Sequence, residues 1–255
     1  MTFVVASPPL SLRGARIAYG DRVVASDLAL DLPGGRTTCL LGRSGVGKTS
    51  LLRWLAGLLP GTERAEPLAY MAQRDLLLPW LSLLDNVLLG HRLRRDAAAL
   101  AVAEPRARRL LAEVGLGHRL GDRPETLSAG MRQRTALART LCEDRPVVLM
   151  DEPFAHLDAV TRLELQDLAA RLLAGRTVVL VTHDPLEALR LGHQVRVLSG
   201  TPFTVGPAIE PPGSVPRDPA DPTLLGLQGR LIAELRSVHG SATGSANGSD
   251  TGGAT

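Results

Sequence analysis

Lysine is almost absent from this sequence. Of the 29 basic residues, 28 are arginines and the single lysine is Lys48. A bias that has removed lysine everywhere else indicates that arginine cannot serve at position 48, because an ammonium is a compact point charge whereas a guanidinium is planar and larger. We therefore expect a close-range cation at this position.

Cysteine and aromatic residues are scarce as well. The two cysteines, Cys39 and Cys142, form neither a disulfide framework nor a metal-site spacing, which favours a reducing compartment and a role as small core residues. Aromatic residues make up only 3% of the chain, so leucine, valine and alanine must supply the core.

Long hydrophobic runs are lacking too. The most apolar stretch, residues 76–89, is interrupted by Pro79, Asp85 and Asn86 and cannot span a bilayer. We expect no secretory signal, because the first 20 residues lack a basic segment followed by an apolar run and a cleavage site. Membrane association then has to come through a partner.

Length and charge set only broad limits. A chain of 255 residues suits one α/β domain with a smaller inserted lobe. The net charge of +3 is compatible with nucleic acid, anionic lipid or a nucleotide and does not discriminate between them.

The hydrophobic pattern predicts strands that alternate with helices. Strands at 10–19, 23–32 and 36–41 form an antiparallel start, and the later alternation argues for a parallel sheet with crossover helices. Further strands are expected at 68–71, 147–150, 177–182 and 194–198. Helices are expected at 48–57, at 81–114 with an interruption at Pro105, from Gly130, and at 161–173, 185–191 and 224–238. Residues 202–222 are predicted to form a loop or a small edge structure.

A glycine-rich loop follows the third strand. Residues 42–49, GRSGVGKT, fit the pattern G-x-x-x-x-G-K-[ST] between a strand and a helix. Backbone N–H groups of such a loop face phosphates, Lys48 reaches the β- and γ-phosphates, and the Thr49 hydroxyl ligates Mg²⁺. The flanking elements and the solitary lysine argue against a chance glycine-rich turn. The expected nucleotide-binding residues are Gly42, Arg43, Ser44, Gly45, Val46, Gly47, Lys48, Thr49 and Ser50.

Two carboxylates end the apolar strand at 147–150. Asp151 is placed to hold a metal ion, and Glu152 is placed to polarise an attacking water. Alone, this pair is also typical of a polar strand end. Beside a phosphate loop it predicts an enzyme that hydrolyses ATP.

Several further segments, in order and spacing, resemble the ATP-binding cassette (ABC) ATPases over about residues 10–200. LSAGM at 127–131 is similar to the family signature LSGGQ, with Ala129 and Met131 as departures. Gln73 resembles the Q-loop glutamine, residues 155–158 the D-loop and 181–184 the H-loop. Tyr19 lies where the family places the aromatic residue that stacks on adenine.

The resemblance implies a fold and a set of roles. The fold is α/β: a P-loop NTPase core with a parallel sheet, an N-terminal antiparallel β subdomain and an inserted α-helical subdomain. The domain is expected over 1–239, with the helical subdomain at about 74–140 and a disordered tail at 240–255. Glu152, His183, Lys48 and Gln73 would be catalytic, and Thr49, Gln73 and Asp151 would bind Mg²⁺.

The resemblance also implies a composite ATP site. In the family, the signature serine and glycine contact ATP held by the opposite subunit, which implies a head-to-tail homodimer with Ser128 and Gly130 in trans. Taken alone, Gln73 is more typical of a solvated loop residue, His183 suits strand-end packing equally well, and Tyr19 suits a plain strand. Their register with the other motifs favours the nucleotide site.

Segment 76–80, which contains Leu76 and Trp80, places apolar residues where we expect surface, and such patches usually mark partner sites. Within the family this region contacts a transmembrane permease subunit, although these leucines would also suit the core of the helical lobe. We expect residues 85–87 to cap and begin the next helix.

The importer resemblance extends to substrate and location. The sequence LLPW followed by DNV is similar to importer ATPases for sulfonates, taurine, nitrate and thiamine precursors, and most to those for the thiamine precursor hydroxymethylpyrimidine. A substrate-binding protein, periplasmic or lipid-anchored, is an indirect partner, and the chain is expected on the cytoplasmic face of the plasma membrane. A soluble ABC ATPase of DNA repair or translation would bring a coiled-coil insertion, zinc modules or two cassettes. We see none of these, and expect no nucleic-acid partner.

Overall fold

The computed structural model describes residues 7–60, 62 and 67–243 and is built around a six-stranded sheet. The strand order is β4-β5-β6-β3-β7-β8. Neighbours are parallel except at the edge, where β8 runs antiparallel to β7. The strands are β3 (Thr37–Gly42), β4 (Leu68–Met71), β5 (Val147–Asp151), β6 (Thr177–Thr182), β7 (Gln194–Gly200) and β8 (Phe203–Val205). The predicted parallel sheet is confirmed, and the short edge strand β8 lies in the segment expected to be a loop or a small edge structure.

A second, two-stranded antiparallel sheet precedes the main one. It pairs β1 (Leu10–Tyr19) with β2 (Arg22–Leu32), as expected for the N-terminal subdomain. The third strand does not continue it. Strand β3 inserts between β6 and β7 as a parallel strand, so the expected three-stranded antiparallel start is wrong. The reason is that β3 is buried on both faces, which suits the interior of a parallel sheet.

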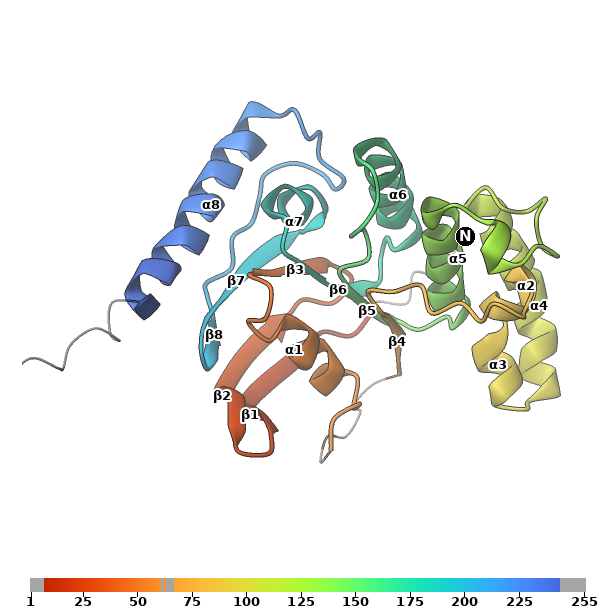
Figure 1. Ribbon diagram of the computed structural model, residues 1–255, viewed down its shortest axis with the longest axis horizontal. Helices are drawn as coiled ribbons and strands as arrows, with labels where there is room; N and C mark the ends of the chain where they lie inside the picture. The colour runs from red at the N-terminus through yellow and green to blue at the C-terminus, as the bar shows by residue number, and fades with distance from the viewer. Residues whose placement is uncertain (1–6, 61, 63–66, 244–255) are drawn as a thin grey trace, which may run out of the picture.

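Helices cover both faces of the main sheet (Figure 1). Helix α1 (Lys48–Leu55) and the β1–β2 sheet share one apolar cluster with one face of the main sheet. The other face packs against a larger cluster that includes residues of α5 (Ala129–Cys142), α6 (Ala159–Leu172), α7 (Pro185–Leu191) and α8 (Pro222–Thr243). Helix α8 enters the segment expected to be a disordered tail, of which residues 244–255 lie outside the described part of the chain.

The inserted lobe is helical, as expected. It contains α2 (Leu83–Val87), α3 (Leu89–Leu93), α4 (Ala97–Glu113), the 3-10 turn η1 (Pro124–Thr126) and the start of α5. Helix α4 continues through Pro105, so the predicted interruption there is wrong. Pro105 is exposed while Ala103 and Ala107 face the core, so the carbonyl that loses its hydrogen bond lies on the solvent side.

Helix α2 begins before residues 85–87, which were expected to cap and begin it. Ser82 is its N-cap and accepts a hydrogen bond from the Asp85 amide at 3.1 Å, so the expectation that residues 85–87 cap the helix is wrong. Asn86 is fully buried instead. Its side-chain Nδ2 donates to the Leu78 carbonyl at 3.1 Å, and its Oδ1 accepts from the Leu78 backbone N–H at 2.7 Å. These two hydrogen bonds fix the turn before the helix.

Two features bear on the compartment and the membrane. Cys39 and Cys142 are buried free thiols, which confirms their expected role in the core. In the described ranges, no helix combines the length and apolar character that crossing a bilayer requires.

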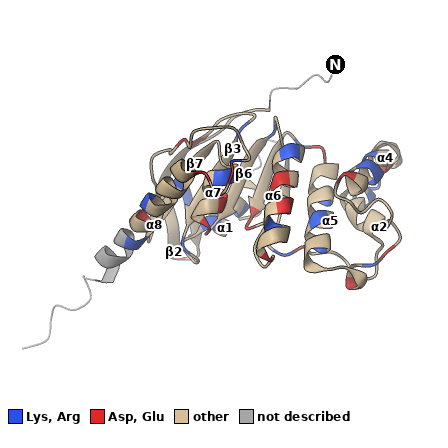
Figure 2. Ribbon diagram, turned by 90° about the horizontal axis from the view of Figure 1, so that it is seen from above, with Lys and Arg blue, Asp and Glu red and all other residues tan. Residues whose placement is uncertain are grey.

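Figure 2 shows basic and acidic residues interspersed along the helices rather than sorted onto one side.

Candidate nucleotide-binding and catalytic site

The phosphate loop ends in a glycine that no other residue can replace without strain. Gly47 is the N-cap of α1 and has φ 119°, in the left-handed region. A Cβ there would lie 2.7 Å from Val24 Cγ1 and 2.8 Å from Phe203 Cδ1. The loop therefore turns tightly into α1, whose N-terminal amides lack intrahelical partners and suit an anion.

Lys48 is buried at the start of that helix. Its side chain is 4% exposed, and Nζ donates to the carbonyls of Gly42 at 2.8 Å and Arg43 at 3.0 Å. Glu152 Oε1 lies 3.4 Å away. Burial lowers the pKa of Lys48, and the nearby charge of Glu152 opposes that shift. The ammonium is thus held by the loop itself, close to where the terminal phosphates of a nucleotide would lie.

Asp151 is held by two hydroxyl groups. Thr49 Oγ1 donates to one carboxylate oxygen at 3.1 Å, and Tyr70 donates to the other at 3.3 Å. Burial raises the pKa of Asp151, and the two hydrogen bonds oppose that shift. The sequence had indicated Thr49 and Asp151 but not Tyr70, whose only signal is its position in a short strand before Gln73.

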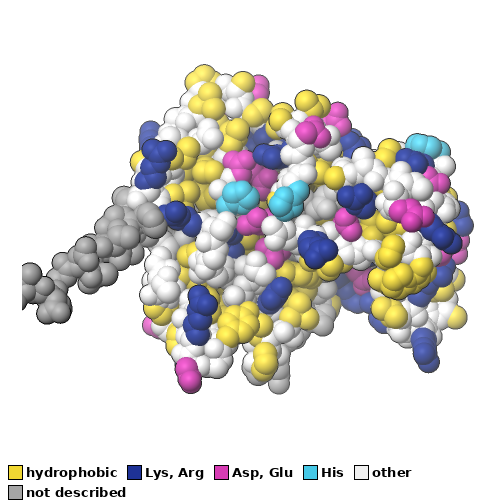
Figure 3. Space-filling model, viewed as in Figure 1, with side chains coloured by type: hydrophobic (Ala, Val, Ile, Leu, Met, Phe, Trp, Pro, Cys, Tyr) yellow, Lys and Arg dark blue, Asp and Glu magenta, His cyan; other side chains and the backbone are white. Residues whose placement is uncertain are grey.

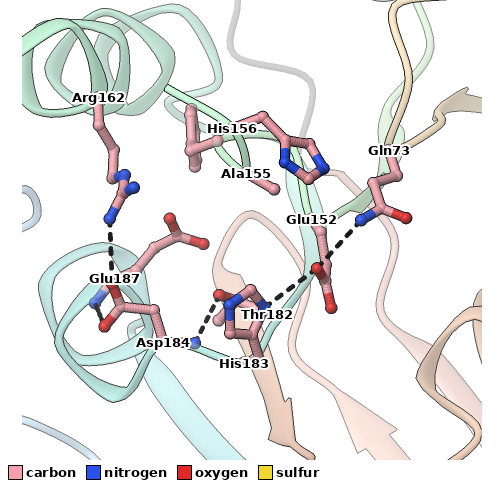
Figure 4. Close-up of a pocket in the computed structure, with 10 residues that line it drawn as sticks. Gln73, Glu152, Ala155, His156, Arg162, Thr182, His183, Asp184 and Glu187 are labelled. Atoms are coloured by element: carbon pink, nitrogen blue, oxygen red, sulfur yellow. Dashed lines mark hydrogen bonds and ion pairs between the residues drawn. The ribbon is translucent and has the colours of Figure 1, made fainter. Parts of the chain in front are cut away.

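Glu152 gathers the remaining catalytic candidates. Its carboxylate accepts a hydrogen bond from Gln73 Nε2 at 3.3 Å and lies 3.0 Å from His183 Nδ1 (Figure 4). The residue has φ 45°, an uncommon conformation outside glycine, and its backbone amide donates to Val181 at the end of β6. Residues from three loops therefore converge on one carboxylate. In Figure 3, histidine and acidic side chains gather near the middle of the viewed face.

The oxygen donors of this site suit Mg²⁺. Thr49 supplies a hydroxyl, Asp151 a carboxylate and Gln73 an amide oxygen. Such hard donors, few in number, match a magnesium ion that also binds phosphate and water. Among the described residues, no group of three or more His, Cys, Asp and Glu is placed to hold a metal by itself.

Tyr19 lies beside the loop. Its side chain is 44% exposed, and its hydroxyl contacts Ser50 Oγ at 3.3 Å. The ring is thus accessible to a flat ligand next to α1. This geometry is compatible with both a stacking role and a plain strand residue.

The signature residues lie elsewhere. Ser128 caps α5 and accepts a hydrogen bond from the Met131 amide at 3.3 Å, while a Cβ on Gly130 would lie 2.6 Å from Thr161 Cγ2. Both line a hollow with residues of α5 and α6 that contains none of the phosphate-loop residues. A separate pocket is lined by Gln73, Glu152 and His183. No residue lines both hollows.

Helix α5 connects the signature to the segment after Gln73, which sequence reasoning missed. Arg132 Nε lies 3.1 Å from Asp75, and Arg139 donates to the carbonyls of Asp75 and Leu76. A buried Gln133 also donates to the Pro153 carbonyl, directly after Glu152. No pattern in the sequence pairs these residues, because their partners are mostly backbone atoms.

Comparison with known proteins identifies this arrangement. The family model described as "ABC transporter" matches residues 25–155. The chain is 40% identical over 254 residues to the aliphatic sulfonates import ATP-binding protein SsuB 2 of Burkholderia cenocepacia, covering 94% of this chain and 92% of that protein. The chain belongs to the ABC transporter family. It is also 42% identical to SsuB 1 of Rhodococcus jostii, covering 89% of this chain and 93% of that protein.

Solved structures of ABC cassettes share the fold. The dimeric post-hydrolysis structure of the ATP-binding cassette MJ0796 bound to ADP and Pi matches with a TM-score of 0.68 and 27% identity, covering 80% of this chain and 99% of that one. This ABC chain is accordingly an ATP-binding cassette ATPase with the expected α/β fold. Relatives named for aliphatic sulfonates match over most of its length. The expected hydroxymethylpyrimidine specificity is therefore not supported.

Proposed function

We propose that this chain is the ATP-hydrolysing subunit of a membrane importer for aliphatic sulfonates. The observation that carries the proposal is the end-to-end match with import ATP-binding proteins, at about 40% identity over 94% of the chain. A match over 94% of the chain extends well beyond the motifs that all cassettes share. Substrate recognition itself belongs to the permease and the substrate-binding protein.

The proposed chemistry divides between two copies of the chain. Lys48 binds the terminal phosphates and Thr49, Gln73 and Asp151 hold Mg²⁺, which would supply charge neutralisation at those phosphates. Glu152 orients and deprotonates the attacking water, and His183 steadies the γ-phosphate. Ser128 and Gly130 of the second copy close the site in a head-to-tail homodimer. The separation of the two hollows within one chain supports this division.

Segment 76–80 is the proposed contact with the permease. The side chains of Leu76 and Trp80 are 57% and 66% exposed, whereas Leu77 between them is buried. The backbone of the segment is tied to α5 by Arg139. An apolar surface held on a fixed backbone suits a protein partner. Through this contact the chain would lie on the cytoplasmic face of the plasma membrane.

Deletion of the gene tests the proposed substrate. The deletion strain should fail to grow with an alkanesulfonate as the only sulfur source and grow normally with sulfate. The wild-type gene should restore growth, and the matched Glu152→Gln gene should not. Undiminished growth of the deletion strain on the alkanesulfonate would refute the substrate assignment.

The purified Glu152→Gln chain tests the mechanism. Without its general base the variant should bind ATP, remain dimeric in size-exclusion chromatography and turn over more slowly by about a hundredfold or more. Unchanged steady-state turnover would refute the role of Glu152.

A further inference from the structure

Tyr70 is placed by the register of two neighbouring strands to reach the carboxylate of Asp151. In the parallel pair β4 and β5, Tyr70 lies opposite Leu149, and both pack into the apolar cluster on the α1 side of the sheet. Asp151 follows Leu149 by two residues and therefore faces the same side. A tyrosine side chain spans about 6.5 Å, roughly two residues of strand, so its hydroxyl arrives at the carboxylate.

The contact completes the support of a buried carboxylate. Asp151 is 4% exposed, and each of its two oxygens accepts a hydrogen bond from a hydroxyl: Oδ1 from Thr49 at 3.1 Å and Oδ2 from Tyr70 at 3.3 Å. A carboxylate held at one oxygen can still rotate about its last bond. Donors at both oxygens fix the plane of the group.

We propose that Tyr70 is a positioning residue for the metal ion, which holds Oδ2 of Asp151 so that Oδ1, shared with Thr49, is presented to the ion. This inference rests on the proposed metal-binding role of Asp151. Residues that orient a metal ligand in this way raise its affinity, because the ligand is ordered before the ion binds.

The competing explanation is packing. The Tyr70 ring contributes to the apolar cluster around α1 whether or not its hydroxyl has a function. Tyr70→Phe separates the two explanations, because it keeps the ring and removes only the hydroxyl. Thr204→Val removes an exposed hydroxyl on β8 that donates to the Ser199 carbonyl, outside the site, and is the control for loss of a hydroxyl.

The experiment measures metal affinity directly. The full-length chain, saturated with ADP, is titrated with Mn²⁺, and free Mn²⁺ is followed by electron paramagnetic resonance. Tyr70→Phe should weaken Mn²⁺ binding by about tenfold, as is typical for loss of an outer partner of a metal ligand. ADP binding of Tyr70→Phe in EDTA, measured by calorimetry, should stay at the wild-type value, and Thr204→Val should keep wild-type Mn²⁺ affinity at saturating ADP.

Three results would overturn the inference. If Asp151→Ala weakens Mn²⁺ binding and Tyr70→Phe does not, the role of Tyr70 fails while that of Asp151 stands. If neither substitution changes Mn²⁺ affinity, the metal-binding role of Asp151 fails and the inference fails with it. If Tyr70→Phe weakens ADP binding in EDTA as much as it weakens Mn²⁺ binding, the hydroxyl supports the phosphate loop and not the metal ligand.

Discussion

The phosphate-loop half and the signature half of the ATP site are built in different ways. Lys48 and Asp151 are each 4% exposed and hydrogen-bonded within the chain, whereas Ser128 lies exposed at the start of α5. Misplaced buried charges are costly, so the first half must be organised before any ligand arrives. Exposed groups carry no such cost. The signature half therefore does not need to be organised before a second copy of the chain binds.

Because of this difference, the structure of a single chain contains the contacts of the phosphate-loop half but not those of the signature half with ATP. Around Glu152, the geometry alone assembles a base, a cation and two polar side chains. Around Ser128, the geometry shows a capped helix and a hollow, and the ATP contact follows from the proposed dimer.

The largest effect is expected at Lys48. Lys48→Arg should reduce ATP hydrolysis by at least about a hundredfold, because the buried site that fits a narrow ammonium between two carbonyls does not admit a planar guanidinium. Steady-state ATPase assays of the purified chain measure this. Arg109→Lys, at an exposed position on α4, is the matched reverse exchange and should leave the rate unchanged. Wild-type turnover in Lys48→Arg would contradict the meaning given to the solitary lysine.

The signature half is tested by charge. Ser128→Asp keeps an N-cap acceptor and adds a negative charge where the γ-phosphate of the other subunit is expected. Hydrolysis should fall by about tenfold to a hundredfold with little change in melting temperature.

Mixing two inactive variants then shows whether the site is shared. In a mixed dimer of Lys48→Ala and Ser128→Asp, one site receives an intact phosphate loop and an intact signature. Random pairing makes half of the dimers mixed, so about a quarter of wild-type activity should return. Mixed dimers without restored hydrolysis would contradict the shared site.

The sequence predicts residues that lie in consecutive elements better than contacts between distant segments. Lys48 and Thr49 were predicted because β3, the phosphate loop and α1 are consecutive in the chain, and Asp151 was predicted because it ends an apolar strand. Partners distant in sequence were missed. Tyr70 meets Asp151 across 81 residues, and Arg139 meets Leu76 across 63 residues. Such contacts depend on strand register and helix packing, which local patterns do not encode.

The errors have physical causes as well. Pro105 was expected to interrupt α4, but its exposed position lets water replace the lost hydrogen bond. The third strand was assigned to the antiparallel sheet by its proximity in sequence. Its burial on both faces instead selects the centre of the parallel sheet.

A smaller effect is expected at Glu187, which connects elements from the two halves. It lies in α7, directly after the His183 loop, and accepts a hydrogen bond at 3.0 Å from Gln166 of α6. Helix α6 also carries Thr161, which packs against Gly130. Burial raises the pKa of Glu187 to about 7.

The raised pKa of Glu187 determines whether the free energy of unfolding rises or falls with pH. The folded state keeps its proton on Glu187 where the unfolded chain has lost it, so the free energy of unfolding falls as pH rises from about 4.5 to 7. Glu187→Gln cannot ionise and should gain stability relative to wild type by up to about 3 kcal/mol between pH 5 and 8. Denaturant unfolding at both pH values measures this, with exposed Glu125→Gln as control. A pH-independent difference would contradict burial of an ionisable group at this position.

The smallest change in the free chain is expected at Trp80. Its side chain is 66% exposed, so Trp80→Ala should alter the free energy of unfolding by less than about 0.5 kcal/mol. If segment 76–80 is the permease contact, the same substitution should abolish co-purification with a permease that is co-expressed with the chain and that binds the wild-type chain. Val102→Ala, at a residue of α4 that is 67% exposed, is the matched apolar control and should keep the complex. If both variants lose the complex equally, the contact involves the helical lobe as a whole. If Trp80→Ala keeps the complex, segment 76–80 is not the permease contact.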